Sequence, residues 1–427
     1  MMAAYDATAP AGGSLTLGFM PLVDCAILVV AREKGFARAE GLDLNLARET
    51  SWANIRDRVA LGHFDAAHML GPMPIAASLG IGRAPVATVA PFALGLGGNA
   101  ITLAAELFGA MRDAAADPNA FARFEPAAVG HALAGVIGRR RAAGHAPPTI
   151  AVVHPFSAHH YEVRYWLHAV GVDPDTDVQI TVLPPAAMGP ALRERRIDGF
   201  CAGEPWGSIA VEAGLGVMAV VKSALWRQGP DKVLGLRADF TARYPEVVAA
   251  LLRALFQAAR WAGDPSNGGE LAALLAGEAY LATPSALIAR ALASRLVRSA
   301  GAAPAGVPDF LVLDRYAATF PWLSHALWFY AQMVRWGHAA LSPDAAAAAR
   351  RSYRPDLYRA ALAPLGADLP RADMKVEGAL QHLTPVASRS GRLMLGPDGF
   401  FDGRLFDPDH LDQYVASFGE RGPLSAE

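Results

Sequence analysis

Three histidines, His154, His159 and His160, stand close together in the stretch HPFSAHHYEVRYW, directly after an apolar segment. An imidazole group can bind a metal ion, donate a hydrogen bond to an anion, or satisfy polar groups at the start of a helix. The neighbouring residues do not complete a convincing set of metal ligands. We therefore expect no metal here, and both the polar helix start and the anion-facing histidine stay open.

A glycine-rich turn, LGLGGNA, contains Gly98 and Asn99 and precedes an apolar segment. Such turns expose backbone N–H groups that can cradle an anion. The spacing matches neither a phosphate loop nor a dinucleotide-binding fingerprint. A tight turn without any ligand explains the glycines equally well.

Several other polar or aromatic residues stand where predicted strands end. Trp52 follows one strand, and GEPWG brings Glu204, Pro205 and Trp206 after another. Glu204 can cap or bridge, Pro205 can start a helix, and Trp206 fits either a cleft wall or a core position. Lys232 opens the segment KVLGLRADF; a lysine there is usually solvated, but facing a cleft it would supply a fixed positive charge.

Together these side chains suit a small oxyanion such as nitrate, which is planar, singly charged and weakly hydrated. Such an anion needs a few convergent donors and one cation within apolar walls. A tryptophan N–H, the Asn99 amide, a histidine N–H and the Lys232 ammonium provide this set. Convergence of residues so far apart in the chain depends on the fold.

The composition is that of a globular chain of 427 residues, with 53% hydrophobic and 18% charged residues. The formal charge of -2 gives no field that would favour nucleic acid or a membrane, so we expect direct contact with neither. The two cysteines, Cys25 and Cys201, are far apart and form no disulfide framework or zinc motif.

Apolar segments with strand and helix periods alternate from residue 14 to about residue 103, which indicates an α/β unit. A second α/β unit starts at TIAVV, and the chain becomes mostly helical after about residue 222. We predict two lobes with a ligand cleft between them. The predicted divisions are a flexible leader at 1–13, lobe 1 at 14–103 plus 223–427, and lobe 2 at 104–222.

Segments along nearly the whole chain, among them GFMPLVDCAILVVAREKGF, FCAGEPW, KVLGLRADF and HALWFYAQMVRWG, resemble the nitrate- and bicarbonate-binding proteins of ABC transporters. The resemblance implies a type II periplasmic-binding-protein fold, in which two lobes close on an anion, with a helical C-terminal part. It implies no cofactor.

The resemblance also implies ligand residues, carried over position by position. They are Trp52, Gly98, Asn99, His159, Glu204, Pro205, Trp206 and Lys232. Asn99 departs from the glutamine of the family and is shorter by one methylene group. A histidine and a lysine suit nitrate or nitrite. The bicarbonate branch is expected to use carboxylates with calcium, and the sequence shows no acidic cluster.

The first residues, MMAAYDATAPAGG, show no basic and apolar export signal and no lipidation cysteine, so we expect a cytoplasmic protein. Within the family the chain looks most like the cytoplasmic nitrate/nitrite sensors of the NasS type. That likeness implies a partner, an ANTAR-type RNA-binding antiterminator (NasT-like). The sensor would hold this partner when free of ligand and release it on anion binding, controlling nitrate-assimilation genes.

Two alternatives stay open. The chain is the solute-binding subunit of a nitrate ABC transporter, or it is an enzyme on the same fold, as thiamine-pyrimidine synthases are. The enzyme is disfavoured because no nucleophile, base and orienting group can be assembled from the sequence. We therefore expect a binding protein without catalytic activity.

Overall fold

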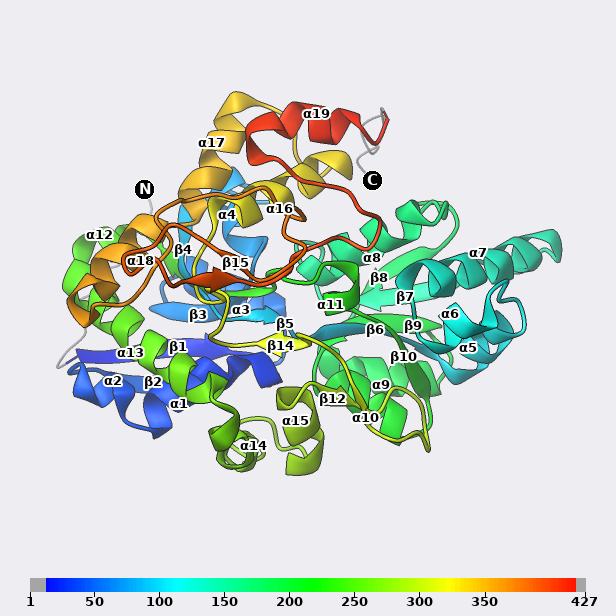
Figure 1. Cartoon of the computed structure of the whole chain (residues 1–427), viewed down its shortest axis with the longest axis horizontal. Coiled ribbons are helices and arrows are strands. Elements are labelled where there is room, and N and C mark those ends of the chain that lie inside the picture. The colour runs from blue at the N-terminus through cyan, green and yellow to red at the C-terminus, as the bar shows by residue number, and fades with distance from the viewer. Residues whose placement is uncertain (1–12, 420–427) are drawn as a thin grey trace.

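Two five-stranded sheets lie side by side in the computed structural model, which describes residues 13–419 (Figure 1). Residues 1–12 of the predicted leader lie outside the described residues. The first sheet has the order β2-β1-β3-β11-β4 and the second the order β10-β6-β9-β7-β8. Two sheets of mixed α/β structure confirm the predicted two-lobed fold.

The first sheet is built from strands that are mostly buried, except β2 at its edge. It contains β1 (Ser14–Phe19), β2 (Asp43–Arg48), β3 (Ala66–Leu70), β4 (Thr88–Ala93) and β11 (Lys232–Arg237). β1 pairs in parallel with β2 and β3. β11 comes much later in the sequence, after the strands of the second sheet, and runs antiparallel to β3 and β4. This return places the first residue of β11, Lys232, opposite Leu70 at the end of β3.

The second sheet combines one strand from before residues 105–148 with four strands from after them. It contains β6 (Asn99–Ala104), β7 (Thr149–Val152), β8 (Gln179–Val182), β9 (Gly199–Gly203) and β10 (Gly216–Val221). β6 runs antiparallel to both β9 and β10. The predicted lobe boundaries remain a prediction, but these pairings place residues 99–103, which we expected in lobe 1, in the second sheet.

The glycine-rich turn is the crossover between the sheets. Its short strand β5 (Leu96–Gly97) pairs with β14 (Leu311–Val312). Gly97 has a φ of +78°, and a Cβ there would overlap the carbonyl of Phe310, so glycine is needed. The N–H of Gly98 donates to the same carbonyl oxygen at 2.6 Å, which leaves it no free hydrogen for an anion.

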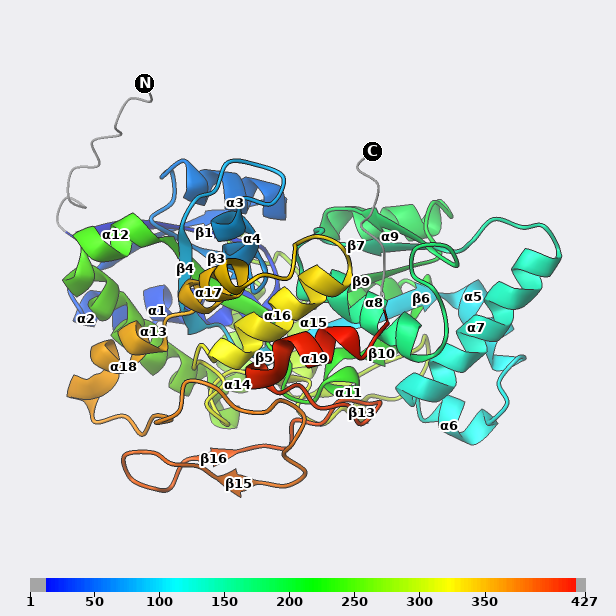
Figure 2. The same ribbon diagram turned by 90° about the horizontal axis from the view of Figure 1, so that it is seen from above.

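Helices cover both sheets and extend the second lobe outward. Residues 104–148, expected to hold one helical run, form three helices at the outer end of the second lobe (Figure 2). These are α5 (Ala105–Arg112), α6 (Pro118–Ala122) and α7 (Pro126–Ala142). Prolines at the first position of α6 and α7 fix where those helices begin.

The remaining helices surround the two sheets. They are α1 (Ala26–Glu33), α2 (Phe36–Ala39), α3 (Trp52–Ala60), α4 (Met73–Leu79), α8 (Ala158–Ala169), α9 (Pro185–Arg193), α10 (Trp206–Glu212), α11 (Lys222–Leu225), α12 (Ala238–Arg243), α13 (Pro245–Gly263), α14 (Gly268–Leu275), α15 (Ser285–Leu292), α16 (Leu323–Arg335), α17 (Pro343–Ser352), α18 (Pro355–Leu362) and α19 (Leu411–Ala416). Short pairs of strands are β12 (Arg295–Leu296) with β13 (Ala305–Gly306), and β15 (Thr384–Pro385) with β16 (Met394–Leu395). Over residues 13–419, no helix combines the length and the apolar character that crossing a membrane requires.

The C-terminal segment passes over both lobes (Figure 2). Glu377 accepts a hydrogen bond from Ser324 at the start of α16, at 2.6 Å. Farther along, Asp402 accepts one from the Tyr165 hydroxyl of α8 in the second lobe, at 2.8 Å. The C-terminal segment therefore contacts both α16 and the second lobe.

Candidate functional site

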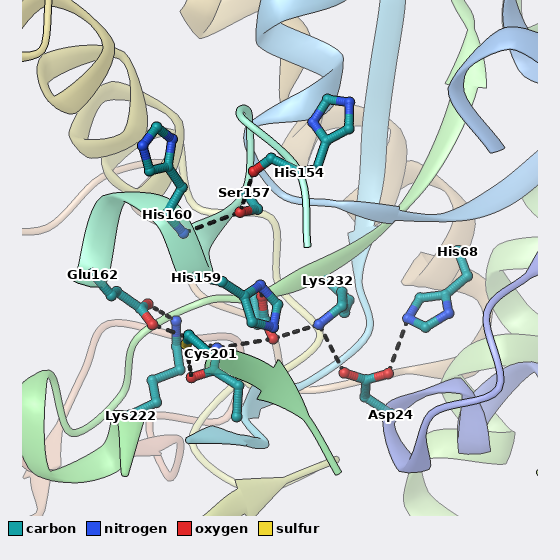
Figure 3. A network of polar contacts seen from close by, with 12 residues as sticks. Asp24, His68, His154, Ser157, His159, His160, Glu162, Cys201, Lys222 and Lys232 are labelled. Carbon is teal, nitrogen blue, oxygen red and sulfur yellow. Dashed lines mark hydrogen bonds and ion pairs between the residues drawn. The ribbon is translucent and has the colours of Figure 1, made fainter. Parts of the chain in front are cut away.

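Polar residues from both lobes meet at the junction between the sheets (Figure 3). Lys232 begins β11 of the first sheet, Asn99 begins β6 of the second, and His159 lies in the first turn of α8. Their side chains are all buried, and His159 is fully enclosed. The structure therefore brings together three of the predicted ligand residues, which lie far apart in the sequence.

The carboxylate of Asp231 lies at the centre of these three residues. Its Oδ2 accepts hydrogen bonds from Lys232 Nζ at 2.5 Å and from Asn99 Nδ2 at 3.2 Å. Its Oδ1 lies 3.7 Å from His159 Nδ1. Asp231 was not among the predicted ligand residues, because an acidic side chain is not expected to contact an anion.

A second carboxylate completes the surroundings of Lys232. Asp24 Oδ2 lies 2.9 Å from Lys232 Nζ, and Asp24 Oδ1 lies 3.1 Å from His68 Nε2. The ammonium group also stands 5.5 Å from the centre of the Trp52 ring, within the range of a cation–π contact. Trp52, which the resemblance placed among the ligand residues, therefore lies against the cluster.

These contacts keep the central groups charged despite their burial. Burial by itself would lower the pKa of Lys232, but the carboxylates of Asp231 and Asp24 raise it above its usual value. Burial would likewise raise the pKa of Asp24 and Asp231, but the Lys232 ammonium holds each pKa below its usual value. The cluster is thus a buried ion network at neutral pH.

A second ion pair adjoins the first. Lys222 and Glu162 are both buried and in direct contact, and Glu162 Oε2 also accepts from Asn99 Nδ2 at 3.4 Å. Burial lowers the pKa of Lys222 to about 7, and the nearby carboxylate of Asp231 opposes that effect. Asn99 therefore links the two ion pairs across the junction.

Asp24, Asp231 and Glu162 correct the expectation that the site lacks an acidic cluster. They are far apart in the sequence, and only the fold assembles them. The sequence feature that could have predicted a buried carboxylate is a charged residue inside an apolar segment, such as Asp24 in LVDCAILVVA. The three carboxylates pair with lysines, and among residues 13–419 no three His, Cys, Asp or Glu side chains are arranged to hold a metal ion.

The three histidines of the first motif have separate roles. His160 Nδ1 lies 2.6 Å from the Pro155 carbonyl oxygen, and its Nε2 accepts from Arg164, so it belongs to the helix start. The Nδ1 of His154 accepts from the backbone N–H of Phe156 at 3.0 Å. Figure 3 shows both rings turned away from the ion network, whereas His159 faces it.

The imidazole ring of His159 is neutral, and its two nitrogens are not used in hydrogen bonds with residues 13–419. Burial lowers its pKa to about 3, so one ring nitrogen carries a hydrogen and the other does not at neutral pH. Within the described residues, neither nitrogen has a hydrogen-bond partner, and the same is true of the indole nitrogens of Trp52 and Trp206. Buried donors without partners are uncommon and mark places where a ligand would gain hydrogen bonds.

The segment Glu204–Pro205–Trp206 lies at the N-terminus of α10, where the second lobe meets the first. Glu204 Oε1 accepts from the Ser208 N–H at 3.1 Å, and its carbonyl oxygen accepts from the Val23 N–H of the first lobe at 2.8 Å. Its Oε2 has no partner in the described chain, and burial raises its pKa to about 7. Pro205 precedes the first residue of α10 and positions Trp206.

Comparison with known proteins agrees with this architecture. The chain matches the NMT1-like family over residues 8–276. It is 32% identical over 417 residues to the nitrate/nitrite binding protein NrtA of Synechococcus elongatus, covering 95% of this chain and 86% of that protein. It is 34% identical over 355 residues to the nitrate import ATP-binding protein NrtC of Synechocystis, covering 83% of this chain but only 50% of that longer protein.

A solved structure shows the same fold over nearly the whole chain. The crystal structure of the periplasmic nitrate-binding protein NrtA from Synechocystis superposes with a TM-score of 0.80 at 27% identity. The superposition covers 97% of this chain and 100% of that structure. Together with the family match, it confirms the predicted resemblance: this chain belongs to the NMT1-like family, among the nitrate- and bicarbonate-binding proteins of ABC transporters.

Proposed function

We propose that this protein binds nitrate or nitrite at the junction between its two lobes. The observation that carries the proposal is the arrangement of Lys232, Asn99 and His159 around a single carboxylate. A carboxylate is a planar, singly charged group whose oxygens accept hydrogen bonds, and nitrate and nitrite share these properties. The same three groups are therefore suited to hold either anion.

The surroundings compensate the burial of such an anion. Removing a charge from water is unfavourable unless a counter-charge and hydrogen bonds replace the water. The Lys232 ammonium supplies the counter-charge, and the unpartnered N–H groups of Trp52 and His159 beside it supply donors. Relatives of this chain are named nitrate/nitrite binding proteins, which supports the choice of anion.

Calorimetric titration of nitrate, nitrite and bicarbonate into the purified protein tests the proposal. We expect saturable binding of nitrate or nitrite, and its loss in His159→Gln because the ring facing the ion network is removed. His160→Gln is the matched control, since that ring contacts Pro155 and Arg164 instead, and it should bind within about twofold of wild type. Equal affinity in all three proteins would refute the assignment of the site.

For its role in the cell, we propose a cytoplasmic sensor that holds an ANTAR-type RNA-binding antiterminator (NasT-like) and releases it when nitrate or nitrite binds. Anion and partner would favour different relative positions of the lobes, and each would weaken the other by the same factor. The likeness of the sequence to sensors of the NasS type supports this role. The protein itself would act without catalysis, as its relatives named as binding proteins do.

The alternative is the solute-binding subunit of a nitrate ABC transporter, which the similarity to a periplasmic nitrate-binding protein favours. Size-exclusion chromatography of the protein with the antiterminator, with and without nitrate, separates the two roles. We expect a complex that dissociates on adding nitrate. Recovery of the native gene product in the periplasmic fraction, with no complex formed, would favour the transporter subunit.

A further inference from the structure

Asp231 uses the same donors that the proposed anion needs. Its two oxygens contact Lys232, Asn99 and His159, and its side chain is buried. Its backbone carbonyl accepts from the Gly71 N–H at 2.7 Å, which fixes the main chain beside the site. We infer that Asp231 is an internal competitor: its carboxylate and the incoming anion compete for the same donors, and the anion binds by displacing it.

The hydrogen-bond count at Asn99 supports direct competition. The amide nitrogen has two hydrogens, and it donates to Asp231 at 3.2 Å and to Glu162 at 3.4 Å. An anion that contacts this nitrogen must therefore take a hydrogen from one of the two carboxylates. Lys232 is less restricted, because its ammonium group has three hydrogens and the carboxylates of Asp231 and Asp24 engage two of them.

Of the three carboxylates, Asp231 is the one that an anion would replace. Asp24 also contacts His68, and Glu162 also contacts Lys222, so each keeps a partner outside the proposed ligand residues. The side-chain contacts of Asp231 in the described chain are with Lys232, Asn99 and His159. A change of its side-chain rotamer would release the hydrogens of Lys232 and Asn99 together and would open the space beside His159, without moving the strand.

The charge balance points the same way. Three buried carboxylates, Asp24, Asp231 and Glu162, face two lysines, Lys222 and Lys232. A further anion beside an undisplaced Asp231 would add like charge in a water-poor environment, where repulsion is strong. Moving the Asp231 carboxylate away from Lys232 removes most of that repulsion. Asp231 therefore lowers the affinity below what the donors alone would give, and sets the anion concentration at which the protein responds.

The inference rests on the proposed function and is tested by nitrate titration of Asp231→Asn, which keeps the shape of the side chain and removes its charge. We expect affinity to increase by about tenfold or more, the size expected when a charge-assisted hydrogen bond no longer competes. Asp24→Asn is the matched control, since it removes an equal charge beside Lys232 but does not contact Asn99 or His159. Unchanged or weaker binding in Asp231→Asn, or an equal gain in Asp24→Asn, would overturn the inference.

A second measurement does not depend on nitrate. Asp231→Ala removes the carboxylate but leaves Lys232, Asn99 and His159 in place, so formate should bind there. We expect formate to raise the melting temperature of Asp231→Ala and to leave wild type and Asp24→Ala unchanged. If wild type binds neither nitrate nor nitrite but formate stabilises Asp231→Ala, the proposed function fails, whereas the part of the inference that places the Asp231 carboxylate on an anion site stands. If wild type binds nitrate, Asp231→Asn binds it no more tightly, and formate does not raise the melting temperature of Asp231→Ala, the inference fails while the proposed function stands.

Discussion

Replacing Lys232 with methionine keeps much of the side-chain volume and removes its charge, which leaves Asp24 and Asp231 buried without their shared cation. Lys232 Nζ lies 2.9 Å from the first carboxylate and 2.5 Å from the second, and all three groups are almost inaccessible to water. Removing one partner of a buried ion pair destabilises a protein by about 3–5 kcal/mol, because the other charge stays in a poor solvent. We expect a loss of that size at pH 7, together with loss of anion binding.

The pH dependence follows from the same contacts. In the wild type, Lys232 lowers the pKa of Asp24 and Asp231, so their contribution is present at neutral pH and is lost as the pH falls through those low values. In Lys232→Met, burial without the cation raises the pKa of both carboxyl groups. Protonation then removes the unpaired charges, and with them the loss of stability, as the pH falls. The stability difference between wild type and variant should therefore be largest near pH 7 and shrink toward pH 4.

Urea unfolding followed by circular dichroism at several pH values measures this difference. The double variant Lys232→Met/Asp231→Asn is the control, since it removes one of the two unpaired charges and should recover part of the lost stability. A variant within about 1 kcal/mol of wild type at pH 7, the range of an exposed ion pair, would refute the account. A deficit that stays constant with pH would refute it as well.

Three further results are expected. Burial raises the pKa of Glu204 to about 7, so the free energy of unfolding should fall as the pH rises from about 4.5 to 7. Relative to Glu204→Gln, which does not titrate, we expect a loss of about 3 kcal/mol, measured by urea unfolding at pH 5 to 8. Gly97→Ala should unfold at clearly lower urea than Gly144→Ala: both residues have positive φ, but only at Gly97 does an added Cβ overlap the Phe310 carbonyl. Asn99→Ala should weaken nitrate binding by no more than about tenfold in calorimetry, because its amide is a neutral donor.

The fold and much of the site could be predicted from local patterns. Alternating strand and helix periods predicted the α/β class, and the two separate α/β units predicted the two lobes. The sheet that strand β6 joins could not be predicted in this way, because the local pattern of an apolar segment of six residues does not depend on which sheet it enters. Pairing with Gly199–Gly203 decided that question, and it also made the glycine-rich turn a crossover between the sheets.

The sequence by itself determined which groups the chain can present to an anion: a lysine at the mouth of a strand, a histidine at the start of a helix, and an amide after a glycine-rich turn. Residue type and local spacing are enough for that, since they set the charge, the donors and the end of each element. Only the tertiary structure decided that Asp24, Asp231 and Glu162 share the same buried junction. Contacts between strands and helices from opposite lobes depend on where the chain crosses from one sheet to the other. Local sequence patterns do not predict those crossovers. The competition between Asp231 and an incoming anion is therefore a property of the fold.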